Sequence, residues 1–438
     1  MIVNLYKRVK NSRQQEKRLF SNTFFLYLLT FSTQLFSLAT VPYLTRVLGA
    51  VVYGKVGLAL AYMAYAQIIL DFGFLLSATE KIVIHRDNPE TAGRILTAVT
   101  CAKVILAIIV SALFTVFVET NGTMKGDSSL YLLYYAAYVA NALMPDFFYR
   151  GIEEMKVITY RTLAIRGFCM GLTFVFIHSP ADCWKIPLFV LIGNAVSAVV
   201  MYVDMARKHR VVFQKISIGE LWQTVKDTLP FFASRIASTA YQAVNTIILG
   251  FVYGTSAVVG YYTSADKIVS ISKTASGPIS DSLYPYMIKE KNYALVKKIL
   301  KIFMPVILAG TVLLFVFAKP ICVILFGAEY AQAGSILRCL LPIVVVILPT
   351  YILCFPVMVP MGLSKYANLS NIVGMCSQGI GLAVLLALHH MDVFSLCILT
   401  SFTEVFVFAF RLAAILIGGK KFRAGNIGKS GVKIESQP

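Results

Sequence analysis

The chain has 438 residues, of which 58% are hydrophobic and only 14% charged, and its mean hydropathy is +0.74. Soluble domains carry about a quarter of charged residues, so a cytosolic enzyme, a disordered chain and a disulfide-stapled scaffold are excluded. The composition predicts an integral membrane protein whose solvent is mostly lipid. The formal net charge of +19 then raises the question of where the charges lie.

Twelve stretches are apolar and long enough to cross a bilayer, which takes about 20 residues. They cover residues 20–43, 53–78, 95–118, 128–149, 157–178, 185–205, 226–252, 257–285, 299–318, 334–361, 366–388 and 393–417. The apolar patch at 320–327 is too short to cross and is expected to lie at an interface. The sequence therefore predicts an all-α polytopic protein with twelve transmembrane helices.

Lysine and arginine predict the orientation of these spans, because cytoplasmic loops carry an excess of both. The first 19 residues hold six basic side chains and are assigned to the cytoplasm. Alternation then places the strongly basic loops and the tail on the same side, and the opposite loops hold only Arg46, Lys125, Lys185, Lys319 and Arg338. Both termini are expected in the cytoplasm, the first span reads as an uncleaved anchor, and most of the net charge reflects topology rather than nucleic-acid binding.

A short pattern recurs six spans apart. Leu48-Gly49 is followed by Tyr53-Gly54, and Leu249-Gly250 is followed by Tyr253-Gly254. The glycines suggest a tight turn and close helix–helix approach at equivalent points of two halves. The predicted organisation is a basic segment 1–19, a six-helix bundle 20–205, a cytoplasmic linker 206–225, a second six-helix bundle 226–417 and a basic tail 418–438.

Catalytic and metal-binding signatures are missing from the sequence. The loops are too short for a folded catalytic domain, and no phosphate-binding glycine loop of the G-x-x-x-x-G-K-[ST] type occurs. The eight cysteines are scattered and form no C-x-x-C pair. The adjacent His389 and His390 lack the spacing of a metal site. We therefore predict a protein that is not an enzyme and needs no cofactor, metal or nucleic acid.

Polar residues form stripes on the first two spans of each predicted half. A charge at membrane depth is costly and usually faces a partner or a water-filled path, although serine and threonine often bond only to neighbouring backbone. The stripes predict one polar cavity. They contain Tyr27 and Gln34 in span 1, Gln67 and Asp71 in span 2, Arg235, Gln242 and Asn245 in span 7, and Asp266, Lys267 and Lys273 in span 8.

The charges in these spans suggest an anionic cargo with sugar hydroxyls. Arginine and lysine supply charge-assisted donors to phosphate, and the candidates are Arg235, Lys267, Lys273 and Lys103. Amide and phenol groups suit sugars, and the candidates are Gln34, Tyr27, Gln67, Gln242 and Asn245. The acids Asp71, Asp146 and Asp266 are candidates for ion coupling. Arg411 and Glu404 in the last span are expected to have a structural role between helices.

Span 10 carries prolines at a spacing of seven residues. Pro342, Pro349 and Pro356 lie on one face, and each removes a backbone hydrogen bond. The pattern predicts either a fixed bend or a flexing gate.

Two segments resemble Wzx-type O-antigen flippases, which form the polysaccharide-exporter branch of a superfamily shared with multidrug and lipid-linked oligosaccharide transporters. The first is Val41-Pro42-Tyr43-Leu44-Thr45-Arg46-Val47-Leu48-Gly49 with Tyr53-Gly54 and the run from Asp71 to Thr79. The second runs from Pro145 to Met155. Relatives commonly carry tryptophan and glutamine in the second motif, where this chain has Phe147 or Phe148 and Arg150.

This resemblance implies a MATE-like fold of two six-helix bundles in a bacterial inner membrane. It also implies the cargo, an oligosaccharide repeat unit on undecaprenyl pyrophosphate that moves to the periplasmic leaflet during lipopolysaccharide biosynthesis. An O-antigen polymerase and a chain-length regulator are implied partners. The first alternatives are a MATE-type drug/cation antiporter and another lipid-linked saccharide flippase, such as one for a peptidoglycan precursor. A membrane glycosyltransferase or polymerase is the alternative from a different class.

Overall fold

The computed structural model describes the backbone of residues 2–86, 88–122, 124–239, 244–254 and 256–430. Within these ranges it describes all side chains except those of residues 2–23, 26, 230, 233–239, 285, 289 and 419–430. All regular elements of the described part are helices and none is a strand, which confirms the predicted all-α class. The chain divides into two compact units, Met1–Gly260 and Tyr261–Pro438, and each is described by itself. The division into two six-helix bundles with the predicted bounds stays a prediction.

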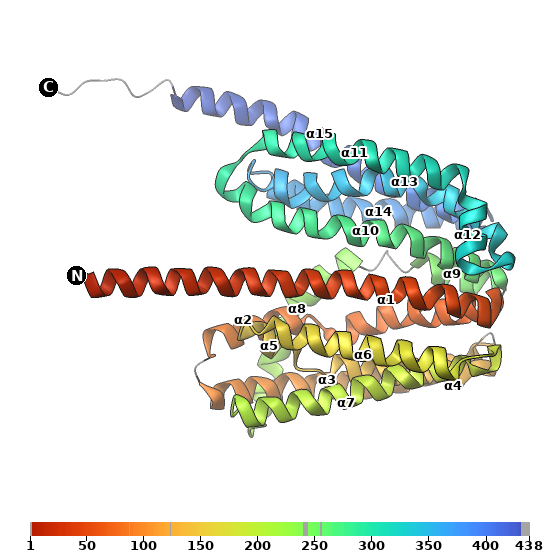
Figure 1. The fold of residues 1–438 in the computed structure, drawn as a ribbon, viewed down its shortest axis with the longest axis horizontal. Helices are drawn as coiled ribbons and strands as arrows, with labels where there is room; N and C mark the ends of the chain where they lie inside the picture. Colours follow the sequence, from red (N-terminus) through yellow and green to blue (C-terminus); the bar gives the residue numbers. More distant parts are fainter. Residues whose placement is uncertain (1, 87, 123, 240–243, 255, 431–438) are drawn as a thin grey trace. The chain divides into compact units, whose positions relative to one another are not determined.

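Unit 1 contains nine helices of the described chain (Figure 1). They are α1 (Ile2–Asp71), α2 (Phe74–Ile84), α3 (Pro89–Thr120), α4 (Ser128–Ala142), α5 (Asp146–Gly151), α6 (Met155–Phe176), α7 (Lys185–Lys208), α8 (Ile218–Thr239) and α9 (Val244–Tyr253). Helix α10 (Ala257–Glu290) begins in unit 1 and continues into unit 2. Short 3-10 turns cover Lys125–Asp127 and Pro180–Trp184.

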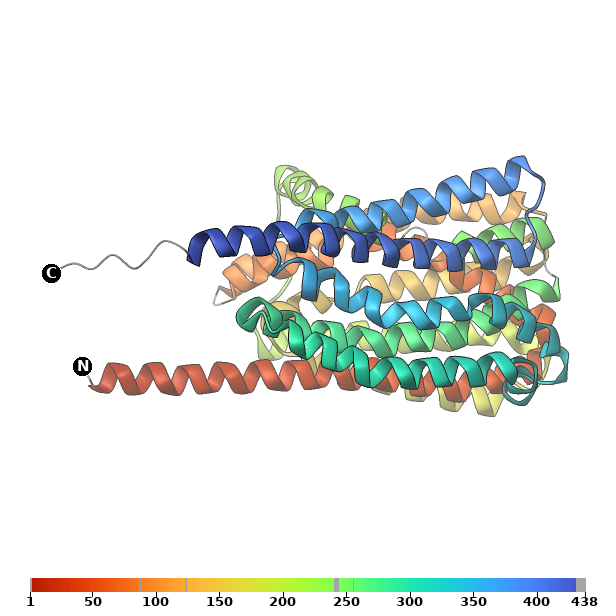
Figure 2. The same cartoon turned by 90° about the horizontal axis from the view of Figure 1, so that it is seen from above.

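Unit 2 contains the rest of α10, followed by α11 (Tyr293–Val316), α12 (Ala318–Phe326), α13 (Ala333–Ile352), α14 (Ser364–Ala387) and α15 (Val393–Ser430). A 3-10 turn covers Ala328–Gln332. Helices α13, α14 and α15 pack together, and α14 and α15 run side by side in both views (Figures 1 and 2). The patch expected at an interface is the short helix α12, whose Cys322 and Phe326 are buried.

Seven helical stretches of the described residues are long and apolar enough to cross a membrane: Tyr27–Ile84, Pro89–Thr120, Pro180–Lys208, Tyr293–Val316, Ala328–Met358, Ser364–Ala387 and Val393–Gly418. The first of these has 58 residues and covers two predicted spans. Other predicted spans do not meet these criteria. The span predicted over 128–149 is broken, because α4 ends at Ala142, and helix α6 carries several charged residues. The count of twelve spans and the cytoplasmic termini therefore remain predictions.

The apolar outer faces of these helices are left uncovered within each unit. Ile108 and Leu113 of α3 are 64% and 67% exposed, and Val306 and Val312 of α11 are 67% and 61% exposed. An apolar surface of this extent is stable only against lipid or another protein. The core of unit 1 instead lies where α2, α3, α5 and α7 meet, around Phe74, Leu96, Phe147 and Met205.

The repeated Leu-Gly and Tyr-Gly pattern forms the tight structure that the glycines predicted. Gly49 has a φ of 72° and breaks α1, and Gly254 has a φ of 60° just after α9. A Cβ atom on Gly54 would lie 2.8 Å from the amide nitrogen of Gly260, and one on Gly260 would collide with the carbonyl oxygen of Ala50. These glycines therefore allow the start of α10 to touch the turn in α1.

Replacing Gly260 by alanine is expected to destabilise the protein by about 1–3 kcal/mol, because the new methyl group meets backbone atoms that cannot rotate away. The matched control is Gly310→Ala in α11, where a Cβ atom has nothing within 4 Å. That change should be neutral or stabilising, since alanine favours a helix by about 1 kcal/mol over glycine. Thermal unfolding of the purified variants measures both, and equal midpoints for the two would contradict the close contact.

The proline-rich span 10 is bent rather than straight. Helix α13 ends at Ile352 and continues as a π-helix over Leu353–Met358, in which Cys354 has a non-helical ψ of −108°. Pro356 lies inside this segment and cannot donate a backbone hydrogen bond. The structure confirms the bend, and the alternative of a flexing gate stays a prediction.

Candidate functional site

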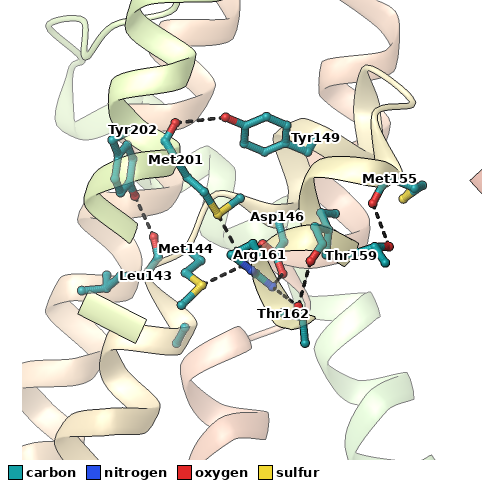
Figure 3. A network of polar contacts seen from close by, with 12 residues as sticks. Leu143, Met144, Asp146, Tyr149, Met155, Thr159, Arg161, Thr162, Met201 and Tyr202 are labelled. Atoms are coloured by element: carbon teal, nitrogen blue, oxygen red, sulfur yellow. Dashed lines mark hydrogen bonds and ion pairs between the residues drawn. The ribbon is translucent and has the colours of Figure 1, made fainter. Parts of the chain in front are cut away.

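The break between α4 and α5 positions the first group of candidate residues. Helix α4 ends at Ala142, so the carbonyl groups of Ala142 and Leu143 lack partners in their own helix. Lys103 of α3 donates from Nζ to the Ala142 oxygen at 2.6 Å, and Tyr202 of α7 donates to the Leu143 oxygen at 2.7 Å (Figure 3 shows Tyr202). A cation at a helix C-terminus is favourable, so Lys103 caps α4.

The acids near Lys103 are two of the predicted coupling residues. Asp71 is the last residue of α1, and Asp146 is the first residue of α5. Both carboxylates interact electrostatically with the ammonium group of Lys103. Lys103 is only 6% exposed, and its ammonium also lies 6.0 Å from the centre of the Phe147 ring. Unit 1 therefore places the half-buried Asp71 and Asp146 within electrostatic reach of the buried Lys103.

Arg161 of α6 is the closest partner of Asp146, and the sequence analysis missed it (Figure 3). Its Nη1 donates to Oδ1 of Asp146, and its Nη2 donates to Oδ2 at 3.2 Å. Nη1 also points at the sulfur of Met144, 2.8 Å away. Two parallel bonds between a guanidinium and a carboxylate form a strong pair that links α5 to α6. The available signal was an arginine inside a predicted span, which implied an acidic partner nearby.

Tyr149 ties the same region to α7. Its hydroxyl lies 2.7 Å from Oδ2 of Asp204. It also lies 3.0 Å from the carbonyl oxygen of Met201 (Figure 3). The ring is fully buried. Together with the bond from Tyr202, this contact fixes α5 and the end of α4 against α7.

A second cluster of charges lies in unit 2. Nζ of Lys273 in α10 lies 3.4 Å from Oε1 of Glu404 in α15, and the Glu404 side chain is only 9% exposed. Asp266 lies two helical turns before Lys273. Its carboxylate interacts electrostatically with the ammonium groups of both Lys273 and Lys267. The structure thus brings together three of the candidate residues on α10 and adds Glu404 as the partner of Lys273.

Arg411 has the structural role between helices that the sequence predicted. Its Nε donates to Oγ of Ser370, its Nη1 to the carbonyl oxygen of Thr350 and its Nη2 to Oδ1 of Asn371, each at 2.8 Å. The side chain is 5% exposed. It therefore joins α13, α14 and α15 next to the π-helix.

The candidate sugar-contacting residues are spread over α1 and α9. Tyr27, Gln34 and Gln67 are half-buried on α1, and Asn245 is buried on α9. Oε1 of Gln67 is buried and accepts no hydrogen bond from any described residue. Gln242 and the side chain of Arg235 lie outside the described residues. The roles of all these residues stay predictions.

A cavity of 460 Å³ lies among α2, α3 and α8 in unit 1. Two of its lining cations have acidic partners, because Arg94 lies 3.4 Å from Glu220, which also lines the cavity, and Lys81 lies 2.7 Å from Asp227. The amide of Ser217 donates to Glu220 and, with Arg94, lowers the pKa of that carboxyl group. The described residues contain no group of acids, histidines and cysteines suited to a metal ion.

The Lys273–Glu404 pair can be tested by a double-mutant cycle. Lys273→Met leaves Glu404 without its cation. We therefore expect this change and a neutralising change of Glu404 to glutamine to be coupled by about 1–2 kcal/mol in the free energy of unfolding. The exposed pair Lys208–Glu154, 2.8 Å apart, is the control and should give less than about 1 kcal/mol. Denaturant unfolding in detergent measures both cycles. Additive single effects at Lys273 and Glu404 would show that the pair contributes nothing.

Comparison with known proteins places the chain in a family. Residues 19–291 match the family described as polysaccharide biosynthesis protein. A protein of Escherichia coli (strain K12), described as a candidate O-antigen transporter, is 25% identical over 328 residues, which cover 74% of this chain and 79% of that protein. A protein of Shigella dysenteriae with the same description is 26% identical over 406 residues, covering 90% and 99%.

Two solved structures show the same fold. One is an inward-facing multidrug resistance MATE family transporter of the MOP superfamily, with a TM-score of 0.68 and 15% identity over 90% of this chain and 95% of that chain. The other is the lipid II flippase MurJ in an inward closed conformation, with a TM-score of 0.66 and 13% identity over 94% of each. The predicted MATE-like architecture is therefore confirmed. With its apolar helices, the chain is a multi-pass protein of the inner membrane. Because the family match covers more than half of the sequence, the chain belongs to the polysaccharide biosynthesis protein family.

Proposed function

We propose that the protein is a flippase for lipid-linked polysaccharide precursors. In its specific form, it moves undecaprenyl-pyrophosphate-linked O-antigen repeat units from the cytoplasmic to the periplasmic leaflet during lipopolysaccharide biosynthesis. The observation that carries the proposal is the family match over residues 19–291. Two relatives described as candidate O-antigen transporters support the cargo, and the named relatives are transporters or flippases rather than enzymes.

The proposed topology is twelve spans with both termini in the cytoplasm. The polyprenyl tail stays in lipid, because burying its apolar surface in the bilayer is favourable. The pyrophosphate and sugars enter the polar interior, and an alternating-access change exposes them on the other side. An O-antigen polymerase and a chain-length regulator would act on the product.

Arg235 and Lys267 are assigned the main part in neutralising the pyrophosphate, with assistance from Lys273 and Lys103. Lys273 pairs with Glu404 and Lys103 caps α4, so each of these two would have to share its charge with an existing acceptor. Charge-assisted bonds to phosphate oxygens are stronger than neutral ones. The sugars are assigned to Tyr27, Gln34, Gln67, Gln242 and Asn245.

Coupling to protons or sodium is assigned to the acids Asp71, Asp146 and Asp266. Each has a basic neighbour, so binding of a cation would have to compete with an existing interaction. Asp146 is held strongly, because Arg161 binds both of its oxygens.

Complementation tests the proposed function in cells. Expression in a bacterial strain that lacks its own O-antigen flippase should restore the ladder of long lipopolysaccharide chains and remove the accumulated lipid-linked repeat units. The same cells should gain no resistance to cationic drugs, which a MATE-type antiporter would confer. Drug resistance without lipopolysaccharide, in cells that contain the protein in their membrane, would favour the antiporter instead.

A further inference from the structure

Arg166 lies in the middle of α6, and its side chain is exposed. Ten residues separate it from the end of the helix at Phe176, which is about 15 Å along the axis. An arginine side chain is too short to reach the membrane surface from this depth. A charge held here therefore needs a partner or water at the same level of the membrane.

The direction of Arg166 follows from the burial pattern of α6. Tyr160, Phe168 and Val175 form an apolar stripe that is 60%, 45% and 60% exposed. Thr159 and Thr173, seven residues before and after Arg166, are 0% and 4% exposed. Residues seven apart lie within about 20° of one another on a helix, so Arg166 shares the face of the buried threonines. It points away from the stripe that would face lipid.

Two polar groups of unit 1 lie within electrostatic reach of Arg166. Its charge acts on Tyr138 of α4 and on Cys169, one turn along α6. Helix α6 runs parallel to α1, because Thr159 donates to the Phe25 carbonyl at 3.0 Å and Tyr43 donates to the Ile177 carbonyl at 2.7 Å. The separation along the chain is 134 residues at both contacts, which places Arg166 level with residue 32 and within one turn of Gln34.

Arg166 has no internal acceptor among the described residues, in contrast to Arg161 and Arg411. Arg161 is bound by Asp146, and Arg411 donates to three oxygens. Among the residues that the structure describes, no hydrogen bond or ion pair is formed by Arg166. An exposed and unsatisfied guanidinium on an inward face is available to an external anion.

We propose that Arg166 is an anion-binding residue of unit 1 that takes an oxygen pair of the substrate pyrophosphate. This inference rests on the proposed function and assigns a further residue to it. The guanidinium presents its donors in a planar fork that matches two phosphate oxygens, which a lysine cannot reproduce. Along the helix axis, Arg166 lies within one turn of Gln34, which is one of the residues assigned to the sugars.

Binding of farnesyl pyrophosphate, a short polyprenyl pyrophosphate, to the purified full chain tests this assignment. Arg166→Ala should weaken binding about tenfold or more, and Arg166→Lys should give an intermediate loss. The control is Arg207→Ala, an exposed arginine at the end of α7, which should bind as the unchanged protein does. Farnesol, which lacks the phosphates, should not distinguish the variants. Unchanged binding of farnesyl pyrophosphate by Arg166→Ala would overturn the inference.

Stability separates this role from a structural one. Because Arg166 has no internal partner, Arg166→Ala should unfold at the same temperature as the unchanged protein or higher, and a clear loss of stability would overturn the inference. The same measurements on the unchanged protein test the proposed function separately. If the unchanged protein neither binds farnesyl pyrophosphate nor restores lipopolysaccharide, both proposals fail. If it does both and Arg166→Ala does so equally well, only the assignment of Arg166 fails.

Discussion

Replacing Arg235 and Lys267 together by alanine is expected to reduce transport of the lipid-linked saccharide about 100-fold or more. Each hydrogen bond to a charged group contributes about 1.5–3 kcal/mol. The two free-energy losses add, so the two reductions in transport rate multiply. The single changes should each give a smaller loss. Transport is measured as the rate at which lipid-linked repeat units reach the periplasmic leaflet, normalised to the amount of protein in the membrane.

The control removes two positive charges elsewhere. Lys297 and Lys298 are exposed in the first turns of α11 and make no hydrogen bond or ion pair with any described residue. The variant Lys297→Ala with Lys298→Ala should therefore transport normally. If the Arg235 and Lys267 double variant also transports normally, the assignment of these residues to the pyrophosphate is wrong.

Breaking the Asp146–Arg161 pair is expected to have the largest effect on stability. Asp146→Ala leaves the Arg161 guanidinium, which is only 12% exposed, without its carboxylate, and we expect a loss of about 2–4 kcal/mol. Arg161→Leu should cost a similar amount. Thermal or denaturant unfolding of the purified variants measures the effect, and the free energy of unfolding is the quantity to compare.

The double variant with Asp146→Ala and Arg161→Leu provides the control for this prediction. Removing both charges avoids an uncompensated ion, so the double variant should be more stable than either single variant. Losses that simply add would show that each residue acts through other contacts. A double variant that is stable but fails in transport would instead support a coupling role for Asp146.

The sequence predicted the all-α class because the signal for helices is local. Apolar runs of about 20 residues and the prolines and glycines between them mark where helices begin and end. The turn at Gly49 and the bend beside Pro356 both occur where these residues stand. The break at Phe72 and Gly73 was missed because it follows from packing. A Cβ atom on Gly73 would lie 2.9 Å from Phe231, and Phe72 stacks on Phe232 with ring centres 4.3 Å apart.

The candidate site was predicted less completely, because partners far apart in the chain leave no local pattern. Lys103 was correctly identified as a charge within a span, but its acceptor is the Ala142 carbonyl, which becomes free only because α4 ends there. The two charges of α6, Arg161 and Arg166, were visible in the sequence. Only the structure shows that the first is bound by Asp146 and that the second is exposed on an inward face.

Charged side chains of the helices thus fall into two groups: those with an acceptor inside their own unit, and those without one among the described residues. Lys103, Arg161, Lys273 and Arg411 have acceptors within their own unit, and these contacts hold helices together. Loss of one of these contacts is expected to destabilise the fold. Arg166 belongs to the second group and is expected to show the reverse, with little effect on folding and a large effect on the anionic cargo.

Movement of a lipid-linked saccharide across a membrane by the purified protein tests the central claim most directly. Liposomes that contain the protein and a fluorescent saccharide on a short polyprenyl pyrophosphate can be treated with a reagent that quenches only the outer leaflet. We expect a second pool of label to become accessible over time in protein-containing liposomes and not in protein-free ones. Equal accessibility in both would contradict the claim that this protein is a flippase.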